Sequence, residues 1–241
     1  MIDNFSIGQA VQISFGNVQD LEAEVQFFQK LGFKLLGRDI VPYPWANLFD
    51  GAVRVVLNGD DRDYVGITYF AEDILDQATK LQDIVFVENN LCIGSENYKT
   101  LQDPSGVHIH LIPQKPNSNT IPVTNIKNPV FLDRFGEFAI PVANIDESIA
   151  FWEKLGYQTH GRYTQPYNWA ILTDREHMVI GLHQTTMFEK PHLTYFAKDM
   201  SDKIKNLESI GVKMQSFGGE QNKIATSPNG HKVNLFTGQL T

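Results

Sequence analysis

The sequence has little cysteine, no long apolar run and no excess of positive charge. Cys92 is the only cysteine among 241 residues, which excludes an internal disulfide framework and a cysteine-rich zinc site. No apolar stretch reaches the roughly 18 residues that a membrane-spanning helix needs. The first residues lack a basic segment followed by an apolar one, so no secretory signal is expected. These absences predict a cytoplasmic protein with no membrane partner.

Acidic residues outnumber basic ones, which argues against one class of partner. The formal net charge is -8, and no basic cluster is available to neutralise a phosphate backbone. Nucleic acid is therefore not an expected partner, and the acidity favours solubility. No phosphate-binding loop, nucleotide fingerprint or Ser-His-Asp order is present.

The dominant feature is an internal repeat. Residues 27–50 (FFQKLGFKLLGRDIVPYPWANLFD) align without a gap with residues 151–174 (FWEKLGYQTHGRYTQPYNWAILTD), and about half of these positions are identical. Residues 66–74 (GITYFAEDI) match 192–200 (HLTYFAKDM), and 103–112 (DPSGVHIHLI) match 227–236 (SPNGHKVNLF). A repeat of this length indicates two copies of one fold.

The segment between the copies, rich in Pro, Asn and Thr, has no sustained period and is predicted to be a linker. The predicted boundaries are a first domain over 1–113, a linker over 114–130 and a second domain over 131–241. In the second domain, residues 137–142 alternate as a strand and 144–156 follow as a helix, with Asn144 or Asp146 as the N-cap and Gly156 as the stop. Strands, a helix ending at Gly211 and three short strands complete the copy.

This organisation resembles the vicinal oxygen chelate superfamily, which includes glyoxalase I, bleomycin-resistance proteins, fosfomycin-resistance enzymes and extradiol dioxygenases. The segments that carry the resemblance are 140–157, 227–236, ISFGNVQDLEAEVQFFQKLGF of the first copy and 103–112. The resemblance implies an α+β fold of two tandem domains. Each would consist of paired βαβββ modules that form a curled mixed sheet around a cup, with helices outside.

Alternation along the strands predicts which side chains face the cup. If Phe138 and Ile140 pack against a helix, Glu137 points into the cup. The same reasoning turns His183, His192, Thr194, Phe196 and Asn234 inward, and it also favours His160, Arg162 and Trp169 as cup residues.

The resemblance implies four metal-ligand positions per domain, normally His, Gln or Glu. In the second domain these read Glu137, Gly181, His192 and Asn234, with His183 two residues beyond the glycine. A candidate site of Glu137, His183 and His192 would suit Zn, Fe, Mn or Ni, although two residues amount to about 7 Å along a strand. In the first domain the matching positions read Ala10, Val56, Gly66 and His110, which predicts no metal there.

Other interpretations of these residues stay open. Glu137 would be a general base or ligand, or would pair with Arg162. Candidate substrate-binding residues are Arg162, Tyr167, Trp169, Phe196 and Asn234, yet Trp169 and Arg162 are repeated as Trp45 and Arg38, which also favours structural roles. His183 and His192 would alternatively be ordinary hydrogen-bonded residues. His108 and His110 lie on the same face of one strand, where they would either bind a metal ion together or line a polar cup.

Two functions follow for the second domain. The first is a divalent-metal-dependent lyase or dioxygenase acting on a small oxygen-chelating substrate. Extradiol dioxygenases place two histidines and a glutamate on three of these strands. The corresponding residues here are Glu137, His192 and Asn234, which argues against ring cleavage. The alternative is a metal-free small-molecule binding or sequestration protein of the bleomycin-resistance type. Four modules in one chain allow a monomer or a homodimer.

Overall fold

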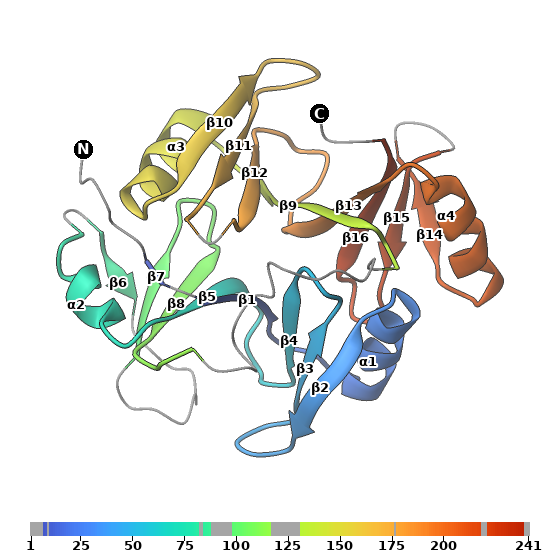
Figure 1. The fold of residues 1–241 in the computed structure, drawn as a ribbon, viewed down its shortest axis with the longest axis horizontal. Helices are drawn as coiled ribbons and strands as arrows, with labels where there is room; N and C mark the ends of the chain where they lie inside the picture. Colours follow the sequence, from blue (N-terminus) through green and yellow to red (C-terminus); the bar gives the residue numbers. More distant parts are fainter. Residues whose placement is uncertain are drawn as a thin grey trace.

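The computed structural model describes residues 7–8, 10–81, 84–87, 98–116, 131–175, 177–217 and 221–238. Within them each half of the chain forms one eight-stranded mixed sheet, and Figure 1 shows the four helices at the periphery. The α+β fold with two tandem domains is thus confirmed. Most of the predicted linker, and Cys92, lie outside the described residues.

The first sheet has the strand order β2-β3-β4-β1-β5-β8-β7-β6. Its first module is β1 (Ala10–Phe15), α1 (Leu21–Lys30), β2 (Lys34–Asp39), β3 (Trp45–Phe49) and β4 (Arg54–Asn58). Its second module is β5 (Val65–Phe70), α2 (Ile74–Ala78), β6 (Phe86–Val87), β7 (Lys99–Gln102) and β8 (His108–Ile112). The two modules join through the antiparallel pair β1 and β5.

The second sheet repeats this order as β10-β11-β12-β9-β13-β16-β15-β14. Its modules are β9 (Arg134–Pro141), α3 (Ile145–Lys154), β10 (Gln158–Tyr163), β11 (Trp169–Thr173) and β12 (Val179–His183), then β13 (His192–Ala197), α4 (Met200–Ser209), β14 (Met214–Ser216), β15 (Lys223–Thr226) and β16 (Lys232–Thr237). Both domains therefore have the paired βαβββ modules expected from the sequence.

Local sequence explains where the helix α3 begins and ends. The Asn144 side chain accepts hydrogen bonds from the amides of Asp146 and Glu147 at 3.1 and 3.3 Å, so Asn144 is the N-cap. Gly156 follows the last turn with a φ of 90°, a conformation that glycine adopts without steric cost. Both boundaries match the prediction.

One apolar core runs through both domains. It is formed by the helices and by the alternate strand residues that face them, such as Phe138, Ile140, Leu193 and Leu235, all fully buried. Full burial of each such side chain contributes about 1.5–3 kcal/mol. The opposite face of each sheet is therefore the one that carries polar side chains.

Polar contacts join the two domains in a crossed arrangement. The first module of the first domain contacts the second module of the second domain, and the remaining two modules contact each other. The helix α1 lies beside the last strands of the chain (Figure 1), where buried Glu24 contacts the Nδ1 of His231 at 2.6 Å and the Nδ2 of Asn229 at 2.7 Å. The Tyr195 hydroxyl donates to Asp50, and the Trp152 indole donates to Asp103 at 3.2 Å.

We predict that Glu24→Ala lowers the free energy of unfolding by about 3 kcal/mol, because it leaves His231 and the Asn229 donors without an acceptor inside the protein. The matched control is Glu22→Ala on the same helix. Glu22 is exposed and pairs with exposed Arg38 at 3.0 Å, so its loss is expected to change stability by less than about 0.5 kcal/mol. Urea unfolding measures both, and equal losses would contradict the role of Glu24.

Candidate functional site

Glu137 and His183 form a buried pair in the cup of the second domain. The Glu137 Oε1 lies 3.0 Å from the His183 Nε2, and each residue is 8% exposed. The Tyr167 hydroxyl lies 3.3 Å from the other imidazole nitrogen, Nδ1. A chain of three polar groups therefore runs from the half-buried Tyr167 to the carboxylate.

Gly181 makes room for this pair. A Cβ atom at Gly181 would stand 2.1 Å from the Glu137 Oε2 and 2.6 Å from the His183 Nε2, far inside van der Waals contact. The carboxylate thus occupies the space that a side chain on β12 would fill. The sequence marks this glycine only as a missing metal ligand, and its effect on Glu137 depends on the register between β12 and β9, in which Gly181 lies opposite Ala139.

Aromatic rings form one wall beside His183. The Trp169 ring is nearly parallel to the imidazole, with centroids 5.9 Å apart, and its other side stacks on Tyr163 at 4.2 Å. Of the predicted substrate-binding residues, Tyr167 and Trp169 therefore gather around the buried pair.

The other predicted substrate-binding residues lie elsewhere. Phe196 contacts Phe236 at a centroid distance of 5.7 Å, and Asn234 donates to the Thr194 hydroxyl at 3.1 Å. Arg162 does not enter the cup. Its guanidinium pairs with Asp146 in the first turn of α3, so the alternative pairing of Arg162 with Glu137 is wrong.

Arg162 is placed at the rim because β10 is the edge strand of its sheet, where alternate residues face solvent and the helix rather than a closed cup. Arg38 repeats the geometry with Glu22, which favours the structural interpretation of both arginines. His160, also on β10, is exposed and hydrogen-bonds Thr173. Alternation alone was not sufficient to predict the surroundings of an edge strand.

His192 is buried without a partner for one of its ring nitrogens. The residue is 3% exposed, and the Nδ1 atom makes no hydrogen bond. Burial, and then the positive charge of Lys232, lower the pKa of His192 to about 4, although Asn234 opposes the shift. The Oδ1 atom of Asn234 is likewise buried and unpaired.

Phe188 contacts both His192 and His183. Its ring stacks on His192 with centroids 4.8 Å apart and meets His183 edge-on at 5.6 Å. Among the described residues, no three His, Cys, Asp or Glu side chains converge closely enough to hold an ion. The set of Glu137, His183 and His192 therefore does not fit a metal in this arrangement, because the three side chains do not converge and the carboxylate is hydrogen-bonded to one of the imidazoles.

The cup of the first domain is filled by its own side chains. Tyr64 stacks on His108 at 5.5 Å and meets His110 edge-on at 5.8 Å, and the His110 Nδ1 bonds the Thr100 hydroxyl at 2.9 Å. Burial is the main cause that lowers the pKa of His110 to about 3.

One repeat alignment needs correction. Thr68 and Thr194 are equivalent, and their partners on the neighbouring strand are Gln12 and Glu137. Gln12, rather than Ala10, is therefore the first-domain counterpart of Glu137. The equivalence follows from the register of β1 with β5 and of β9 with β13, because β1 and β9 share too little sequence to be aligned directly.

A pocket of about 420 Å³ lies next to the Phe188 ring, at the end of the cup that faces the first domain. His192, Lys232, Phe188 and Lys190 contribute to its lining, and Val65 of β5 closes it from the first domain. None of Glu137, His183 and Asn234 borders this pocket.

Comparison with known proteins gives a relationship at the level of the fold. No family model matches the sequence, and no curated protein matches it. Solved structures do match over almost the whole chain. A catechol 2,3-dioxygenase is 14% identical and superposes with a TM-score of 0.62, covering 98% of this chain and 89% of that one. The chain has the fold of the vicinal oxygen chelate superfamily.

Two further extradiol dioxygenases superpose on this chain over nearly its whole length. The 2,2',3-trihydroxybiphenyl 1,2-dioxygenase of Sphingomonas wittichii is 18% identical with a TM-score of 0.63, covering 97% of this chain and 91% of that one. A homoprotocatechuate 2,3-dioxygenase variant from Brevibacterium fuscum is 10% identical with a TM-score of 0.68, covering 98% and 72%. At these identities the shared property is the two-domain architecture. Within the described residues, no helix is long and apolar enough to cross a membrane.

The low pKa values of His192 and His110 predict an acid-sensitive fold. Both imidazoles are neutral in the folded protein, whereas in the unfolded chain each takes up a proton near pH 6.5. Stability is then greatest above that pH and falls as the pH decreases toward 4, by up to about 1.4 kcal/mol per pH unit for each histidine.

His192→Gln is expected to reduce this slope in urea unfolding measured between pH 7 and 4. His177→Asn, which removes an exposed imidazole outside the cup, is the control and should leave the slope unchanged. An unchanged slope in His192→Gln would show that His192 is protonated in the folded state.

Proposed function

We propose that the protein binds a small molecule in the second domain without a metal ion. The observation that carries the proposal is the pocket of about 420 Å³ beside Phe188, whose lining includes His192 with its unpartnered Nδ1 atom. Ligand pockets commonly have volumes of 300 to about 1,000 Å³ and combine an apolar lining with a few polar groups. The pocket has both features.

The Phe188 ring supports a binding role over metal chemistry. Its stacking on His192 provides a flat apolar wall, and the same ring contacts His183, which is hydrogen-bonded to Glu137. A binding function of the bleomycin-resistance type requires shape and a few hydrogen-bonding groups, both of which are compatible with this arrangement.

A divalent-metal-dependent lyase or dioxygenase is the second candidate. It is favoured by the fold, because the solved structures compared above are dioxygenases, and by the buried unpaired atoms of His192 and Asn234. In that case Glu137 would be a ligand or a base, and Zn, Fe, Mn or Ni would be the metal.

Metal analysis of protein purified without chelators or a nickel column separates the two functions. We predict less than about 0.1 metal ion per chain, because the three candidate ligands do not converge. Stoichiometric Zn, Fe, Mn or Ni that is lost in His192→Ala would instead establish the metal-dependent candidate.

Thermal unfolding with a set of small aromatic compounds tests binding directly. A ligand at 100 times its dissociation constant stabilises the fold by about 2.7 kcal/mol, which gives a rise of several degrees in the unfolding temperature. Phe188→Ala should reduce this rise. Phe217→Ala, which removes a ring that stacks on Phe236 outside the pocket lining, should not. Metal-free protein that no compound stabilises would contradict the proposal.

A further inference from the structure

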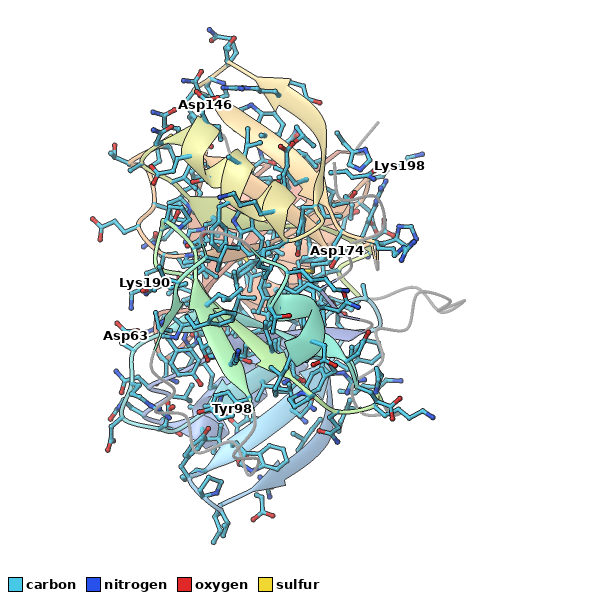
Figure 2. The ribbon with its side chains drawn as sticks, turned by 90° about the vertical axis from the view of Figure 1, so that its left-hand side faces the viewer. Asp63, Tyr98, Asp146, Asp174, Lys190 and Lys198 are labelled. Carbon is cyan, nitrogen blue, oxygen red and sulfur yellow. The ribbon has the colours of Figure 1, made fainter. Side chains whose placement is uncertain are left out.

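The pocket beside Phe188 lies at the junction of the two domains. Its walls are the loop between β12 and β13, the turn that leads into β16 and, from the first domain, Val65. The loop is tied across the junction by Lys190, whose ammonium lies 2.7 Å from the Asp63 carboxylate (Figure 2). The turn is tied by His231, which contacts Glu24 of α1. Both domains are therefore needed to form the pocket.

Two of the nitrogen-bearing side chains at this pocket contact acidic partners, and a third does not. Lys190 pairs with Asp63, and His231 pairs with Glu24. In the part of the chain that the structure describes, the Lys232 ammonium forms no salt bridge. Glu189 also lines the pocket but is exposed, whereas Lys232 is half-buried. Solvent screens the Glu189 carboxylate more strongly, so the Lys232 ammonium favours a ligand with a single negative charge.

His192 supplies a second polar group at the same position. Its Nδ1 atom is buried and unpartnered, which costs free energy unless a ligand or solvent provides a hydrogen bond. His192 and Lys232 precede the paired residues Leu193 and Val233 on the adjacent strands β13 and β16, and both line the pocket. A carboxylate can accept a hydrogen bond from an Nδ1–H and at the same time approach an ammonium.

Apart from Thr186 and Gly230, the rest of the lining is apolar. Phe188, Met187, Pro191 and Val65 border the pocket together with the aliphatic stems of the lysines. A carboxylate carried on a compact aromatic or aliphatic body would bury its apolar part against this surface.

We propose that the pocket binds a small organic monocarboxylate, held by the Lys232 ammonium and by a hydrogen bond from the His192 Nδ1. The proposal rests on the function proposed above and names the class of its ligand. It also assigns the first domain a role as one wall of the site, through Val65 and the tie to Asp63.

Calorimetric titration of the full chain with benzoate and its neutral isostere benzamide tests the proposal, and hexanoate with hexanamide provides an aliphatic pair. The carboxylates are expected to bind about tenfold more tightly than the amides, because a charge-assisted contact is lost in the amide. Lys232→Met is expected to weaken carboxylate binding about tenfold and leave amide binding unchanged.

The matched control is Lys205→Met, because Lys205 is an exposed lysine of α4 outside the pocket lining, paired with Asp202. Its effect on carboxylate affinity should be about twofold or less. Unfolding midpoints close to that of the wild type establish that the variants fold. Replacement of His192 by Phe, which keeps a ring and removes the donor, should weaken carboxylate binding selectively.

Equal affinity for carboxylate and amide, or an unchanged affinity in Lys232→Met, would overturn the assignment of an anionic ligand while leaving metal-free binding intact. Absence of binding by all four compounds would also overturn it. A stoichiometric metal in the purified protein would instead reject the function proposed above, so the two failures are distinguishable.

Discussion

The apolar core that both domains share is the constraint on which the remaining structure depends. Each sheet has one face that must be buried, and in every central strand alternate side chains pack into the core on that face. Leu193 and Tyr195 of β13 and Val233 and Leu235 of β16 are fully buried there. Because successive side chains of a strand point to opposite faces, the residues between these core positions lie on the concave face. His192, Thr194 and Asn234 are therefore brought into one cup without any requirement that they interact.

The same constraint explains why polar groups are buried between the domains. A crossed packing of modules places the start of α1 against the closing turn of the second domain, where Glu24 would be an isolated buried charge without His231 and Asn229. Burial alone would raise the pKa of Glu24, but the hydrogen bonds and the charge of His231 lower it below its ordinary value. The stabilising contribution of this contact is thus present near neutral pH and is lost as the pH falls through the lowered pKa. Correct docking of the domains also closes the pocket between them.

Much of the fold could be predicted because the repeat and the alternation report on burial, which is a property of neighbouring residues. The N-cap at Asn144, the helix end at Gly156 and the inward position of Glu137 all follow from local rules. The pairing of Glu137 with His183 follows from strand register, which local rules specify only approximately. The role of Phe188 could not be predicted, because it belongs to a loop with no period, and its contacts with His183 and His192 are tertiary contacts. The predicted direction of the Arg162 side chain was wrong for a related reason. An edge strand such as β10 has a neighbouring strand on one side only, so its side chains are less enclosed.

The difference between His192 and its repeat partner Gly66 has a steric explanation. In the first domain a Cβ atom at Gly66 would lie 3.1 Å from the Nε2 of His110, so the His110 ring already occupies the space above β5. In the second domain the position of His110 is taken by Asn234, whose shorter side chain leaves this space free. The ring is supplied there by His192, from the adjacent strand. In each domain a deeply buried imidazole thus comes from this parallel strand pair, His110 from β8 in the first and His192 from β13 in the second. The exchange alters what the imidazole can contact: His110 is held by Thr100 under Tyr64, whereas His192 stands at the end of β13 that borders the pocket. A duplicated fold can in this way keep its packing while only one copy presents a polar ring to a ligand.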